Sequence, residues 1–103
     1  MDKLLNETVE IARNYFLKLG FKNEQIAPLI ESGKRDLTKE LLKLQKLLEK
    51  HYKEIDTINL SLHALKGLFL TMGNITIADK LLELHHENVT SHDILEIKKI
   101  LGI

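Results

Sequence analysis

The apolar residues of this chain recur at three- and four-residue spacing almost throughout, and this period most constrains the fold. Such spacing places apolar side chains on one face of an α-helix. No segment alternates apolar and polar residues over enough positions to predict a β-strand. The sequence also has one proline and five glycines, so few positions interrupt a helix. We therefore predict an all-α chain.

The helical segments are separated by short connections. We expect a first helix over 3–19 ended by Gly20, and a short second helix capped by Asn23, with Pro28 tolerated if it falls in the first turn. Ser32-Gly33 indicates a break, although a long helix could continue through it with a bend. Further helices are expected over 36–52, from Asp56 or Thr57 to 73–74, after a cap at Thr76, and after a capping sequence at 90–93.

Short connections favour antiparallel neighbours. The predicted fold is an antiparallel up-and-down four-helix bundle with one or two accessory N-terminal helices, forming a single domain over 1–103. The positions expected to face inward are Leu5, Val9, Ala12, Phe16, Leu19, Ile26, Leu29, Ile30, Leu37, Leu41, Leu44, Leu48, Ile77, Leu81, Leu84, Ile94, Ile97 and Leu101.

Composition narrows the range of partners. The formal net charge is zero, with 15 basic and 15 acidic residues, and no basic stripe is evident, so we expect no nucleic-acid partner. The outer face of 36–52, rich in Lys and Glu, is interpreted as a solvated surface. No stretch approaches the ~20 apolar residues of a membrane span, and the N-terminus does not resemble a secretory signal. We expect a cytoplasmic protein without a membrane partner.

The stretch 62–73 places a titratable group away from the core. Its apolar face is expected to consist of Leu62, Leu65, Phe69 and Met72. At about 100° per residue, the roughly opposite face carries His63, Lys66, Gly67 and Leu70. An exposed imidazole beside an ammonium and a glycine suits a histidine that accepts and hands over a charged group.

These residues carry a resemblance to a known family. The pattern His63-x-Leu65-Lys66-Gly67 followed by Gly73 resembles the signature of the histidine phosphotransfer (HPt) family. Members of this family are helical bundles that occur alone or as the first domain of chemotaxis-type histidine kinases. The motif spans a dozen residues, and the helical pattern extends the likeness more loosely over most of the chain.

The resemblance implies that His63 is a phosphoacceptor in a two-component phosphorelay. The chain would then be a phosphate carrier rather than an enzyme, and would exchange the phosphoryl group with a response-regulator receiver domain, a histidine kinase or both. It implies no cofactor on this chain, because Mg²⁺ belongs to the partner. Lys66 would stabilise the phosphate and Gly67 would give the partner access. Leu60 and Leu70 could form a docking patch, although each taken alone suits the periphery of the core.

The sequence departs from the family at two places. Leu68 and Phe69 replace residues that are usually small, which affects packing between helices rather than the outward face. Chemotaxis-type members also carry a glutamate on the following helix that contacts the phosphorylatable histidine. An ungapped count puts His85 there, flanked by Glu83 and Glu87, so either a shift of one or two residues supplies the carboxylate or this chain lacks that partner.

Other interpretations remain open. The chain could be the N-terminal phosphoacceptor domain of a chemotaxis-type kinase, which a glutamate near His63 would favour. It could instead be a bundle that is never phosphorylated and serves as an interaction module, which a covered His63 would favour. Adjacent His85 and His86 point about 100° apart, so we expect no metal site. We expect a monomer, because a four-helix core is complete within one chain.

Overall fold

The computed structural model describes residues 1–50, 54–84 and 91–103. This part of the chain contains helices and no strands, which confirms the all-α prediction for it. The helices are α1 (Asp2–Lys18), α2 (Asn23–Glu49), α3 (Ile55–Thr71), α4 (Ile75–Glu83) and α5 (Ser91–Leu101).

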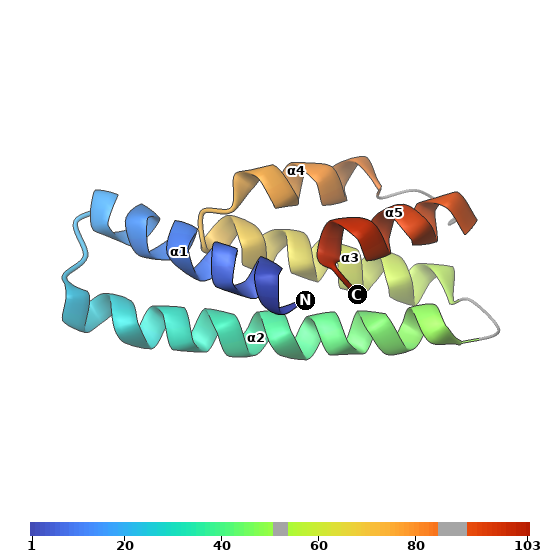
Figure 1. Ribbon diagram of the computed structural model, residues 1–103, viewed down its shortest axis with the longest axis horizontal. Coiled ribbons are helices and arrows are strands. Elements are labelled where there is room, and N and C mark those ends of the chain that lie inside the picture. Colours follow the sequence, from blue (N-terminus) through green and yellow to red (C-terminus); the bar gives the residue numbers. More distant parts are fainter. Residues whose placement is uncertain (51–53, 85–90) are drawn as a thin grey trace.

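The helices form an elongated body of 46 × 21 × 20 Å. The long α2 extends along it, and α1 and α3 both pack against α2 (Figure 1). Helix α4 packs chiefly on α3 and also contacts α5, and consecutive helices run in opposite directions (Figure 1). The two ends of the chain meet where the Met1 ammonium donates a hydrogen bond to the carbonyl oxygen of Gly102 at 2.7 Å.

Helix α2 is continuous, so the break expected at Ser32-Gly33 was wrong and the long-helix alternative was right. Gly33 serves packing instead: a Cβ there would lie 2.8 Å from the Sδ of Met72. The N-cap is Lys22 rather than Asn23, because the Gln25 side chain accepts a hydrogen bond from the Lys22 N–H at 2.9 Å. Pro28 lies past the first turn, where its ring removes one backbone hydrogen bond.

The turn between α3 and α4 forms as expected at 73–74, but the cap of α4 differs. Gly73 adopts a φ of +80°, which glycine permits and which ends α3. Asn74, rather than Thr76, caps α4 by accepting a hydrogen bond from the Ile77 N–H at 3.4 Å. The buried Asn74 amide also donates to Thr8 Oγ1 at 3.0 Å, which ties this turn to α1.

The core contains most of the residues predicted to face inward, including all four leucines expected in α2 and all four residues of the apolar face of α3. Leu19 and Leu29 are exceptions, with 57% and 40% of their surface exposed. Both line an open groove among α1, α2 and α3, so their apolar surface is only partly covered. Val9, Ile77, Leu84 and Ile94 are partly buried at the edge of the core. The expected ends of two helices, at 51–52 and at Thr90, lie outside the described residues.

Candidate functional site

Helix α3 holds His63 by burying the opposite side of the helix. Ile58, Leu62, Leu65 and Phe69 follow the helical period and are at most 1% exposed. Burying a large aliphatic or aromatic side chain contributes about 1.5–3 kcal/mol, so rotation of α3 about its axis would cost several such contributions. The position of His63 on the surface is therefore fixed by the core beneath it.

The outward face of α3 presents the predicted site residues to solvent. His63 and Gly67 are exposed, and Lys66, one turn from His63, is half-buried. A Cβ added to Gly67 would meet no atom within 4 Å, so the space beside the imidazole is open. His63 borders a shallow hollow whose other described lining residues, Asp56, Asn59 and Leu60, belong to the same helix.

The two candidate docking leucines lie on the surface rather than at the edge of the core. Leu60 is 70% exposed and Leu70 is 43% exposed. They flank His63 along α3 at three and seven residues, which keeps all three side chains on one face. Exposed leucines on both sides of a titratable group are the arrangement that the sequence predicted for a docking patch.

Ser61 marks the side of α3 that faces α2, because its hydroxyl donates a hydrogen bond at 2.8 Å to the carboxylate of Glu40 on α2. At about 100° per residue, His63 lies about 160° around α3 from Ser61. His63 therefore faces away from α2.

Helix α4 carries two further exposed apolar residues, which the sequence analysis missed. Ile75 and Leu82 are 58% and 54% exposed and lie seven residues apart, on one side of α4. The other side of α4, marked by Lys80 and Leu84, borders a hollow facing α1 and α5. Ile75 and Leu82 therefore lie on the side of α4 away from that hollow. The sequence did not single these two residues out, because the helical period alone does not distinguish buried apolar residues from exposed ones at the edge of the core.

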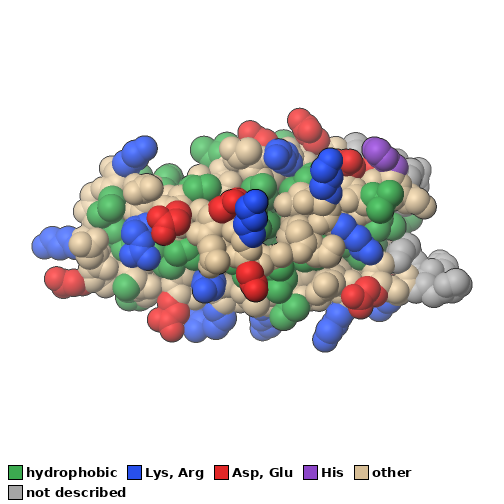
Figure 2. Space-filling model, viewed as in Figure 1, with side chains coloured by type: hydrophobic (Ala, Val, Ile, Leu, Met, Phe, Trp, Pro, Cys, Tyr) green, Lys and Arg blue, Asp and Glu red, His purple; other side chains and the backbone are tan. Residues whose placement is uncertain are grey.

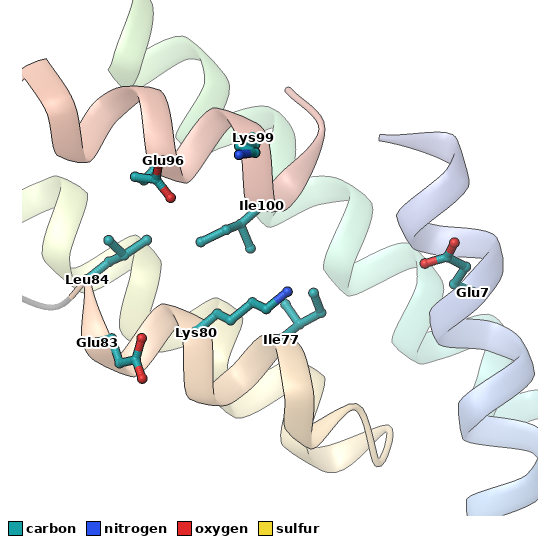
Figure 3. A pocket seen from close by; sticks show the side chains of 8 residues that line it. All are labelled: Glu7, Ile77, Lys80, Glu83, Leu84, Glu96, Lys99 and Ile100. Atoms are coloured by element: carbon teal, nitrogen blue, oxygen red, sulfur yellow. The ribbon is translucent and has the colours of Figure 1, made fainter.

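Of the three candidate second-shell residues, Glu83 is the one that lies among the described residues. Glu83 lines the hollow between α1, α4 and α5, where its neighbours include Lys80 and Glu96 (Figure 3). That hollow is separate from the one that His63 borders. His85 and Glu87 lie outside the described residues.

Among the described residues, no three or more His, Cys, Asp or Glu side chains are grouped so that they could hold a metal ion. None of the helices described has the length and apolar character needed to cross a membrane.

Comparisons with known proteins found no match to this chain among protein-family models, curated proteins or solved structures. A functional assignment therefore depends on the residues around His63 and on their geometry.

Proposed function

We propose that this chain is a histidine-containing phosphotransfer protein that carries a phosphoryl group on His63. The observation that supports it most strongly is the outward face of α3, where an exposed imidazole lies one turn from the Lys66 ammonium and beside the open Gly67. A phosphate carrier needs its nucleophile in solvent and on a rigid element, so that a partner's active site can close over it. The buried opposite face of α3 supplies that rigidity.

The transfer step needs little chemistry from this chain. The neutral imidazole attacks the phosphorus of an aspartyl phosphate on a receiver domain; the N–P bond forms as the acyl P–O bond breaks, and the aspartate leaves as a carboxylate. The reverse step returns the phosphoryl group. Magnesium and most catalytic groups belong to the partner, which makes this chain a carrier and not an enzyme.

Lys66 and Gly67 assist at the phosphoryl group in different ways. The Lys66 ammonium pairs with the phosphoryl oxygens, a contact at the protein surface worth about 1 kcal/mol or less. Gly67 leaves space for the rim of the partner's active site, since no side chain projects there.

The partner's docking surface extends across two helices. We take it to be Leu60 and Leu70 of α3 together with Ile75 and Leu82 of α4, all more than 40% exposed. Apolar surface of this kind around a reactive group supports docking of a protein rather than of a small molecule. In this proposal α2–α5 are the four helices of an up-and-down bundle, α1 is accessory, and the protein works as a cytoplasmic monomer.

The alternatives have less support. An interaction module that is never phosphorylated is favoured by a covered His63, whereas His63 is exposed. A chemotaxis-type kinase domain is favoured by a glutamate at His63; Glu83 borders a different hollow, and Glu87 lies outside the described residues.

The test is phosphotransfer from a panel of labelled phospho-receiver domains and autophosphorylated histidine kinases. Wild type is compared with His63→Gln, and with His92→Gln as a matched control that removes another exposed histidine. We expect label that is acid-labile and alkali-stable, lost in His63→Gln and retained in His92→Gln. Label that persists in His63→Gln, or no label from any donor while receivers still bind, would refute the carrier role.

A further inference from the structure

A row of cations runs along the outward face of α2. Arg35, Lys39, Lys43, Lys46 and Lys50 follow one another at spacings of four, four, three and four residues, and all are exposed. At about 100° per residue they fall within an arc of roughly 80°, on the side of α2 opposite its buried leucines. From Arg35 to Lys50 the row is about 22 Å long, at the helical rise of about 1.5 Å per residue.

The continuity of α2 adds Arg35 to a row of lysines that a helix over 36–52 would already carry. A helix that began at Asp36 would leave Arg35 out of register, whereas the observed helix begins at Asn23 and aligns it with the lysines. Figure 2 shows Lys and Arg side chains along the edge of the molecule that α2 forms, with carboxylates among them.

Most cations of the row form no ion pair among the described residues. Lys50 pairs with Glu54 at 3.3 Å, but across the described residues the other four cations form no ion pair. Like charges four residues apart on a helix repel one another and destabilise it, whereas alternating charges stabilise it. Within the row itself the charges are all positive, so an anionic group bound along it would relieve this repulsion.

Carboxylates border the row and restrict what can bind there. Glu31 and Glu49 lie along one side, and Asp36 lies on the other, all exposed. A broad anionic surface, such as a lipid bilayer, would bring its charge against these carboxylates as well as against the row. A narrow ridge of negative charge avoids them.

An α-helix with acidic residues at three- and four-residue spacing presents such a ridge. Helices pack about 8–10 Å apart, and the ridge of one lies along the groove of the other. The row also offers a place for an apolar side chain, because Leu42 is 43% exposed and borders a shallow hollow together with Arg35 and Lys39. The partner helix is therefore expected to carry one apolar residue beside its acidic row.

We propose that the outward face of α2 binds an acidic α-helical segment of a partner protein. The interaction does not depend on phosphate transfer, because the row is directed away from the core and α3, whereas His63 lies on the far side of α3 from α2. A partner held on α2 would leave His63 open. Failure of either proposal can therefore be recognised separately.

The test uses a pair of synthetic helical peptides of identical composition. One carries glutamates at positions i, i+4, i+8 and i+11 with a leucine beside them, and the other distributes the same glutamates around the helix. Binding of each to the full chain is measured by fluorescence anisotropy. We expect the row peptide to bind about tenfold more tightly than its isomer, and its affinity to fall as NaCl rises from about 50 to about 300 mM.

Variants locate the binding face. Lys39→Gln/Lys43→Gln should weaken the row peptide about tenfold, whereas Lys18→Gln/Lys22→Gln, which removes the same charge elsewhere, should change it less than about twofold. Both pairs are exposed, so circular dichroism should show folded protein in each case. Equal binding of the two peptides, equal loss in the two variants, or tighter row-dependent binding to anionic vesicles or to a short DNA duplex would overturn the proposal.

Discussion

Gly33 and Gly67 are both inside helices, but the same Gly→Ala substitution should have opposite effects at the two sites. Alanine is favoured over glycine inside a helix by about 0.8–1 kcal/mol. At Gly67 the added Cβ meets nothing within 4 Å, so the full gain should appear. At Gly33 the Cβ would lie 2.8 Å from Sδ and 3.1 Å from Cε of Met72, which is only 2% exposed and must move within the core.

The size of the difference follows from these contacts. Overpacking a core costs about 1–3 kcal/mol, which offsets or exceeds the gain in helix propensity at Gly33. We therefore expect Gly67→Ala to stabilise the chain by about 0.5–1 kcal/mol, and Gly33→Ala to range from neutral to about 2 kcal/mol destabilised. For a domain of this size, 1 kcal/mol corresponds to a Tm change of about 4–8 °C.

Urea denaturation followed by circular dichroism at 222 nm measures both variants. The same Gly67→Ala protein also tests the site, because its added methyl group occupies the space left for the partner. We expect it to be more stable than wild type and yet slower in accepting phosphate from a receiver. Destabilisation by Gly67→Ala would show that the outward face of α3 is not open, and equal stabilisation in both variants would refute the close approach of Met72 to α2.

Three further changes test the packing that positions α3 and α4. Asn74→Ala should destabilise the chain by about 2 kcal/mol, because it removes both the cap of α4 and a buried hydrogen bond. Urea denaturation measures this loss. A double-mutant cycle with Thr8→Val should show a coupling free energy above about 0.5 kcal/mol. Ser61→Ala should lower the free energy of unfolding by about 1 kcal/mol, because it removes the hydrogen bond to Glu40. Glu40→Gln should partly retain this hydrogen bond and lose less stability in the same assay. Equal losses in the two variants would refute this role of the hydrogen bond. Phe69→Ala should cost about 3–5 kcal/mol in thermal unfolding, since the ring is fully buried, and a loss below 1 kcal/mol would contradict that burial.

The helical period predicted most of the fold because it records which side of each helix is buried. Leu37, Leu41, Leu44 and Leu48 show this for α2, where every predicted core position is buried. The continuity of α2 could not be predicted in the same way, because a glycine at position 33 is compatible with two different structures. A glycine both weakens a helix and permits a close contact, and only the position of Met72 distinguishes them.

The candidate site was predictable where it depends on one helix and not where it depends on two. His63, Gly67 and Leu70 follow from the period of α3 alone. Ile75 and Leu82 join the proposed docking surface only through the packing of α4 on α3, which the period of one helix does not predict. The cap of α4 was missed for a related reason: Asn74 and Thr76 are both good capping residues, and the hydrogen bond from Asn74 to Thr8, 66 residues away in the chain, is a tertiary contact.

The bulky pair Leu68-Phe69 affects the packing of α3 without changing its outward face. Phe69 is fully buried, and Leu68 lines the groove between α1 and α2, so both lie away from His63. Close approach to α2 is instead provided from the α2 side, where Gly33 leaves room for Met72. Gly33 thus supplies the space that α3 needs beside α2, and the outward face of α3 is unaffected because only its buried half must fit α2.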